Sequence, residues 1–73
     1  MGEFRLIREK DGVEEVLMNR FTIDEDGDWR RPGSKEGINL PLTFRSLFRA
    51  ECRLHYEQKK DPSWNYEITE YLK

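Results

Sequence analysis

The sequence predicts a small α+β domain in which one helix packs on one face of an antiparallel sheet, in the order β-β-β-α-β. Two observations support this fold class. Residues 3–31 alternate between apolar and polar side chains in short runs separated by turn residues, and residues 42–60 combine helical spacing of apolar side chains with an absence of glycine and proline. A chain of 73 residues has room for one hydrophobic core, so residues 1–73 are expected to form a single domain.

Three strands are expected before the helix. The first covers residues 3–9, and the Asp-Gly pair after it favours a tight hairpin turn because both residues tolerate positive φ. The second covers residues 13–24, which are rich in β-branched and aromatic side chains. A short third strand over residues 29–31 would end at Pro32, because proline cannot donate to a sheet, and residues 33–39 are expected to form a loop.

The helix is expected over residues 42–60. Its apolar residues recur at spacings of three and four, which is typical of an amphipathic helix; they are Phe44, Leu47, Phe48, Cys52 and Tyr56. Its start is open between Asn39 and Thr43, because either side chain can cap a helix. Its end is predicted at Lys59-Lys60, since these cations suit the negative end of the helix dipole and Pro62 disfavours a helical conformation for the residue before it.

The tail, residues 63–73, fits two structures. Trp64, Tyr66 and Ile68 alternate as in a strand. A helical stripe is the alternative, formed by Trp64, Ile68, Tyr71 and Leu72. The strand is preferred because tryptophan, tyrosine, isoleucine and threonine pack well on pleated surfaces.

Composition excludes several classes of protein. Charged residues make up 38% of the chain and aromatic residues 12%. The aromatic fraction is too high for a disordered chain. No apolar run approaches the roughly 18 residues of a membrane span. The single cysteine, Cys52, excludes an internal disulfide. The N-terminal residues lack the basic and apolar regions of a signal peptide, so a cytoplasmic protein without membrane association is expected.

The net charge of −2 hides a segregation of charge along the chain. Residues 1–28 contain nine acidic and four basic residues, whereas residues 29–60 contain eight basic and three acidic ones. The middle segment could therefore attract an anionic partner. The alternative is that the two signs neutralise each other within the fold.

Three arginines form the strongest candidate binding site. Arg45, Arg49 and Arg53 are spaced by four, which would place them along one ridge of the predicted helix, beside the apolar residues that precede each of them. Arginine suits interfaces because its guanidinium group forms forked hydrogen bonds and loses water readily. The alternative is a solvated ridge that pairs with acidic side chains of the same molecule.

The segment before the helix could extend this site. Arg30 and Arg31 add charge, and Trp29 belongs to a set of aromatic side chains that a core this small cannot readily bury. The same aromatic side chains could stack on single-stranded bases. The alternative is that the tryptophans close the open ends of a thin core.

Two further patterns fail as chemical sites. Asp24, Asp26 and Asp28 have the spacing of the start of a calcium loop, but the glycine and glutamate that the motif needs later are missing, so an acidic turn is expected and no metal. Cys52 and His55 could touch on a helix, yet no third group orients the ring; the expected arrangement is a cysteine on the core face with a histidine at its edge. No enzymatic activity and no cofactor are therefore expected.

The stretch Leu42-Thr43-Phe44-Arg45-Ser46-Leu47-Phe48-Arg49 is similar to an interaction helix. In this stretch, in its length and in its composition, the chain resembles the small regulators that bacteriophages encode to bind host RNA polymerase. This resemblance implies contacts with polymerase subunits and inhibition of initiation or termination of transcription.

These observations together predict a monomeric, non-enzymatic regulator that binds a larger protein. The alternative is a nucleic-acid-binding domain that uses the arginine ridge and the exposed aromatic side chains, although a negative net charge is unusual for that class.

Overall fold

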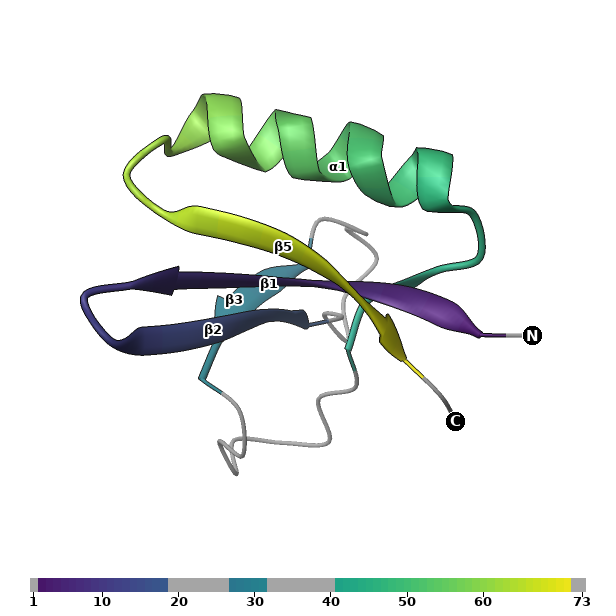
Figure 1. Cartoon of the computed structure of the whole chain (residues 1–73), viewed down its shortest axis with the longest axis horizontal. Helices are drawn as coiled ribbons and strands as arrows, with labels where there is room; N and C mark the ends of the chain where they lie inside the picture. The colour runs from purple at the N-terminus through teal and green to yellow at the C-terminus, as the bar shows by residue number, and fades with distance from the viewer. Residues whose placement is uncertain (1, 19–26, 32–40, 72–73) are drawn as a thin grey trace.

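The computed structural model describes residues 2–18, 27–31 and 41–71 (Figure 1). It contains one helix and an antiparallel sheet of five strands, which confirms the predicted α+β class and the order β-β-β-α-β. One short strand is added before the helix. The elements are β1 (Glu3–Lys10), β2 (Val13–Met18), β3 (Asp28–Arg30), β4 (Thr43–Phe44), α1 (Leu47–Lys60) and β5 (Asn65–Tyr71).

The hairpin of β1 and β2 forms as the sequence predicts. Asp11 and Gly12 have φ values of 52° and 80°, the left-handed conformation that a two-residue hairpin turn requires. Glu9 helps to close the turn, because its carboxylate accepts a hydrogen bond from the Gly12 N–H at 3.1 Å. The register that follows pairs Lys10 with Val13 and Arg8 with Glu15, so Arg8 and Glu15 project from the same face of the sheet.

The sheet is organised around β1. β5 pairs with β1 from Glu3 to Glu9 along one edge, and β2 and β4 share the other edge. β2 takes the part opposite Ile7–Lys10 and β4 takes the part opposite Phe4 and Arg5, while β3 extends the sheet beyond β2. β1 and β5, the first and last of these strands, are thus neighbours over nearly their whole length, as Figure 1 shows.

The helix covers one face of this sheet (Figure 1). Leu6 of β1, Leu17 of β2 and Ala50 of α1 are completely buried and form the centre of the core. Around them pack the half-buried side chains of Phe4, Trp29, Leu42, Phe44, Leu54 and Ile68. Three completely buried residues at the centre of the described part make a small core, which is consistent with the few kcal/mol of net stability typical of domains of this size.

The helix begins later than the sequence indicated. It starts at Leu47 with Ser46 as its N-cap, so the prediction of a start at residue 42 and of Thr43 as the cap is wrong. The reason is competition from the sheet: the Leu42 N–H donates to the Leu17 carbonyl at 3.0 Å, and Thr43–Phe44 pairs with β1. Asn39, the other proposed cap, lies outside the described residues. The predicted end at Lys60 is confirmed.

The remaining predictions about strands have mixed outcomes. The second strand is confirmed over Val13–Met18, and its predicted continuation to residue 24 lies outside the described residues, as does the loop over 33–39. The third strand is displaced by one residue to Asp28–Arg30. The tail is a strand, β5, and the helical alternative is wrong, because pairing with β1 satisfies the backbone of β5 along its length. No helix in the described part of the chain is long and apolar enough to cross a membrane.

Candidate functional site

The most exposed apolar side chains of the described residues lie on α1. Phe48 is 72% exposed, Tyr56 56% and Leu47 48%, and Cys52 is exposed as well. Phe48, Cys52 and Tyr56 follow one another at spacings of four, so they share one side of the helix; we call them the outer stripe. The prediction that Cys52 lies on the core face is therefore wrong.

The other side of α1 faces the sheet. Ala50 is completely buried, Glu57 is 4% exposed, and Leu54 packs against the core. These residues lie about half a turn away from the outer stripe on the helix. The small side chain of Ala50 lets the helix approach the sheet closely. Hydrogen bonds to Glu57 fix which side of the helix faces the sheet. The aromatic side chains of the helix, Phe48 and Tyr56, are thereby left on the outside.

Glu57 is held by two donors from different parts of the chain. The Trp29 indole N–H donates to one carboxylate oxygen at 3.3 Å, and the Arg53 Nε–H donates to the other at 2.9 Å. Trp29 lies in β3, while Arg53 precedes Glu57 by one helical turn. A buried carboxylate needs such partners, because an unpaired charge would be costly to remove from water. Glu57 therefore joins α1 to the far strand of the sheet.

A second charged group, Arg8, is enclosed by aromatic rings. Its guanidinium carbon lies 4.1 Å from the centre of the Trp64 ring and 4.5 Å from that of the Trp29 ring. Two of its nitrogens donate to the same Glu15 oxygen, at 2.6 and 2.9 Å. Trp29 also meets Tyr66 edge to face, with ring centres 5.7 Å apart. Both tryptophans are thus occupied by contacts within the molecule. Trp29 packs against the core, as expected for a residue that closes it, whereas Trp64 is shown in contact with Arg8.

The C-terminal end of α1 is fixed by a compact set of hydrogen bonds. The Tyr66 hydroxyl lies 2.7 Å from the Asp61 carbonyl and 3.1 Å from the Glu57 carbonyl, which also accepts the Asp61 N–H at 2.9 Å. Partial burial raises the pKa of Tyr66, although the nearby Arg8 opposes this shift. The Asp61 carboxylate accepts hydrogen bonds from the Ser63 hydroxyl at 2.6 Å and the Ser63 N–H at 3.3 Å.

These hydrogen bonds make the end of α1 sensitive to acid. Those from the Ser63 hydroxyl and N–H lower the pKa of Asp61 below its ordinary value of 3.8. A carboxyl group with a lowered pKa stabilises the fold above that ordinary value, and the contribution is lost as the pH falls through the pKa of the folded state. We expect urea denaturation midpoints to fall between neutral pH and about pH 3. The fall should be smaller in Ser63→Ala, and an equal fall in both proteins would contradict this assignment.

The structure separates the three arginines of the predicted ridge. Arg45 precedes the helix and is exposed, so the expected helical alignment with the other two is wrong for it. Arg49 is exposed on α1. Arg53 is turned toward the core side, where it binds Glu57. Within residues 2–18, 27–31 and 41–71, neither Arg45 nor Arg49 is bound to a carboxylate, so these two cations are available to a partner.

The additional candidates lie away from the outer stripe. Trp29 is half-buried beneath the helix and Arg30 forms an ion pair of 3.8 Å with Asp28, both within β3. Arg31 is exposed after the end of β3, beside Gly12 and its neighbours at the tip of the hairpin. The structure therefore does not bring these three residues together with Arg49 on one surface.

Cations surround the outer stripe. The exposed charged residues of α1 are Arg49, Glu51, Lys59 and Lys60, so three cations accompany one acid. Tyr56 is itself in contact with cations: the Lys60 amine and the Arg53 guanidinium lie 5.3 and 5.6 Å from the centre of its ring. Contacts of this kind are favourable and hold the ring in place. The outer stripe is thus apolar with a basic margin.

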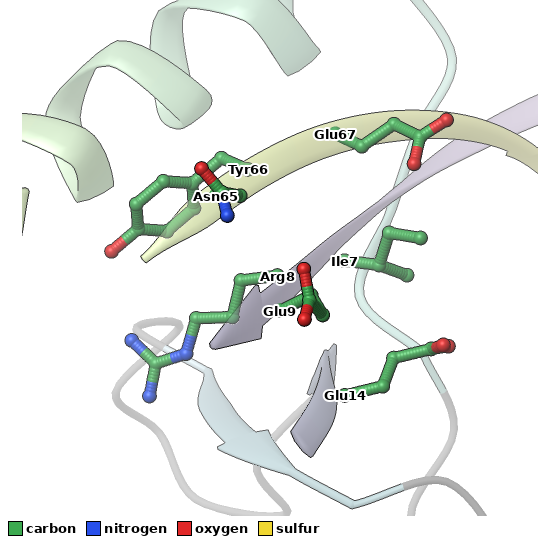
Figure 2. A pocket seen from close by; sticks show the side chains of 7 residues that line it. All are labelled: Ile7, Arg8, Glu9, Glu14, Asn65, Tyr66 and Glu67. Atoms are coloured by element: carbon green, nitrogen blue, oxygen red, sulfur yellow. The ribbon is translucent and has the colours of Figure 1, made fainter. Parts of the chain in front are cut away.

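The opposite face of the sheet has an acidic part, formed by Glu9, Glu14 and Glu67, although Arg5 and Arg30 lie on the same face. In Figure 2, Ile7, Glu14 and Glu67 project to one side of the strands, while Arg8 and Tyr66 project to the other. Glu9 and Glu14 are direct cross-strand neighbours, and Glu67 lies opposite Ile7. These residues line a shallow hollow of about 400 Å³. The molecule therefore presents a basic, apolar helix on one side and an acidic sheet surface on the other.

The other chemical patterns gain no support as sites. Cys52 and His55 are both exposed on α1. The described part of the chain holds no group of three or more histidine, cysteine or acidic side chains that could bind a metal ion. Asp24 and Asp26, the start of the calcium-like spacing, lie outside the described residues.

Sequence reasoning missed two charge pairs, Arg8–Glu15 within the sheet and Arg53–Glu57 on the helix. The Arg8–Glu15 pair could have been found, because an Asp-Gly turn of two residues fixes the register that places these residues opposite each other. No local pattern in the sequence predicts that Glu57 is buried. A glutamate four residues after an arginine is typical of an exposed helical ion pair, and only the position of Trp29 turns it inward.

Comparisons with known proteins give no relative for this chain. Models of protein families, curated proteins and solved structures were all compared with it, and no match was found.

Proposed function

We propose that this protein acts by binding a larger protein through the outer stripe of α1. The observation that carries the proposal is the exposure of Phe48 and Tyr56 on a helix whose other face already packs on the sheet through Ala50, Leu54 and Glu57. A chain with so small a core would gain stability by burying these rings. Aromatic side chains placed together on a surface are typical of a binding site, because they supply most of the binding energy at protein interfaces.

The exposed arginines support the same function. Arg49 lies on α1 itself and Arg45 immediately before it, and both are exposed. Arginine beside aromatic rings is enriched at protein interfaces. The proposed role of the outer stripe is binding alone, so the proposed function is that of a regulator and not of an enzyme.

The structure favours a protein partner over a nucleic acid. Binding of single strands needs aromatic rings that are open for bases to stack on. Trp29 and Trp64 enclose Arg8 instead, so among the described aromatic residues only Phe48 and Tyr56 are widely exposed. The acidic sheet surface would also repel a phosphate backbone.

RNA polymerase is the first partner to test. The resemblance to phage regulators motivates this choice, and an in vitro transcription assay with the purified enzyme tests it. In this version of the proposal, the protein lowers initiation or alters termination. Unchanged transcription at saturating protein would remove polymerase as the partner and leave the outer stripe as a general docking surface.

The arginine on the helix provides a specific test of the docking surface. We expect Arg49→Glu to abolish capture of the partner that the parent protein recovers from a cell lysate in stoichiometric amount, because a charge is reversed beside the outer stripe. The folded far-ultraviolet spectrum should not change, since Arg49 is exposed. Arg31→Glu is the matched control: it changes the net charge equally but lies beyond β3, and it should bind as the parent does. Equal capture by Arg49→Glu would contradict the proposal.

A further inference from the structure

We infer that the surface receiving α1 is an apolar groove with a rim of carboxylates on the partner protein. This inference rests on the proposed function and specifies the chemistry of the partner. It follows from the charges around the outer stripe, from its length, and from the poor fit of a second copy of the same chain.

The exposed charge of α1 is unbalanced, because Glu57 and Arg53 neutralise each other and the remaining charged residues are three cations and one acid. The helix contains two acids, and one of them, Glu57, is enclosed with Trp29 and Arg53 beneath the helix. Glu51 remains as the exposed acid of α1, against the cations of Arg49, Lys59 and Lys60. A partner with carboxylates on its rim would meet these cations favourably, whereas a basic rim would be repelled.

The outer stripe has the dimensions of a short groove-binding helix. Phe48 and Tyr56 are eight residues apart, which is about 12 Å along a helix axis. Cys52 lies between them, so the two rings are separated by a small side chain. A groove with two apolar pockets about two turns apart would take the rings, in the manner of other amphipathic helices that bind in grooves.

A second copy of this chain fits the stripe poorly. Two helices packed antiparallel about Cys52 would place Phe48 against Tyr56 of the other copy, which is favourable. The same arrangement would bring the Arg45 end of one helix against Lys59 of the other, and each copy offers Glu51 as the exposed acid to balance them. Packing the helix on the acidic sheet surface of another copy would be a head-to-tail contact, which forms a ring or an open filament. The shallow hollow on that surface has Ile7 as its one aliphatic lining residue, which is too little to hold two aromatic rings.

The acidic sheet surface also orients the molecule toward such a partner. Glu9, Glu14 and Glu67 lie on the face away from α1. An acidic partner would repel that face and attract the helix, so the approach would be steered toward the outer stripe. Binding that depends on this steering should weaken as salt screens the charges.

Photocrosslinking of the full chain tests the inference. Benzoylphenylalanine replaces Tyr56, which keeps an aromatic ring in the outer stripe, and the protein is irradiated in a cell lysate. We expect one dominant crosslinked protein, with crosslinks in an apolar groove whose surroundings within about 10 Å contain more acidic than basic residues. We also expect the crosslinking yield to fall about tenfold between 0.05 and 0.5 M salt.

Each other outcome is decisive. Crosslinks to a groove with a neutral or basic rim, or a yield that salt does not change, would overturn the inference and leave the proposed function standing. Crosslinks between two copies of this chain would show that a second copy is the occupant. Crosslinks to nucleic acid, or none to any macromolecule, would overturn both the inference and the proposed function. Benzoylphenylalanine in place of Glu14, on the opposite face, is the control and should give no specific product.

Discussion

Replacement of Glu57 by alanine is expected to unfold most of the protein at room temperature. The change removes the acceptor for the Trp29 indole N–H and the partner of the Arg53 guanidinium, both of which remain in the contact between helix and sheet. Breaking a buried charge pair by removing one partner costs roughly 3–5 kcal/mol. A domain of this size has only a few kcal/mol of net stability, so the loss is comparable to the whole. Urea denaturation followed by circular dichroism measures it.

A double variant separates the loss of a partner from the loss of volume. Arg53→Leu combined with Glu57→Leu removes both charges and fills the space with apolar groups. Such replacements of buried ion pairs are often neutral or stabilising. We therefore expect the double variant to recover the part of the stability that Glu57→Ala loses by leaving Arg53 unpaired, while the Trp29 N–H still lacks its acceptor. A Glu57→Ala protein within about 0.5 kcal/mol of the parent, as for an ordinary surface substitution, would show that Glu57 does not join the helix to the sheet.

The combined variant Phe48→Ala and Tyr56→Ala is expected to lose partner binding while it stays folded. These two side chains are the aromatic anchors of the outer stripe and are 72% and 56% exposed, so their removal leaves no cavity in the core. Truncation of an interface hot spot costs at least about 2 kcal/mol, which corresponds to an affinity about 30-fold lower. Calorimetry with the purified partner measures the affinity, and circular dichroism confirms that the variant is folded.

The matched control changes the helix without touching the outer stripe. Gln58→Ala alters an exposed side chain of α1 and should bind the partner within about twofold of the parent, as expected for a near-neutral contact. If Gln58→Ala weakened binding as much as the double variant, the loss would reflect a general change of the helix. If the double variant bound as the parent does, the outer stripe would not be the docking surface.

The fold could be predicted from the sequence where the signal is local. The Asp-Gly turn fixed the hairpin, and proline after Asp61 fixed the end of the helix. The start of the helix could not be predicted, because Leu42 to Phe44 fit a helix locally but are drawn into the sheet by pairing with Leu17 and β1. A strand of two residues leaves no periodic pattern.

The candidate site could be predicted only in part. Spacing by four places Phe48, Cys52 and Tyr56 on one side of a helix, but spacing alone does not say whether that side is inside or outside. The sequence favoured the interior for Cys52, since apolar stripes usually face a core. The orientation depends instead on Ala50 and Glu57, a small residue and a charged one, whose burial follows from contacts with distant parts of the chain.

The arginine ridge shows the same limit. Arg45, Arg49 and Arg53 have equivalent spacing in the sequence, yet only Arg49 is both helical and exposed. Arg53 is held by Glu57 and Arg45 lies before the helix. Of the three arginines, local spacing therefore placed Arg49 alone correctly on an exposed surface of the helix. The apolar residues of that surface, the outer stripe, were expected to face the core and are exposed instead.

Alkylation of Cys52 tests the role of the outer stripe most directly. Cys52 is the single cysteine of the chain and lies between Phe48 and Tyr56, so its rate of reaction with iodoacetamide reports on this surface alone. If α1 docks on the partner through the outer stripe, a saturating amount of partner should slow the reaction at least about tenfold, because the centre of an interface excludes solvent. An unchanged rate in the presence of bound partner would show that the partner binds elsewhere on the molecule.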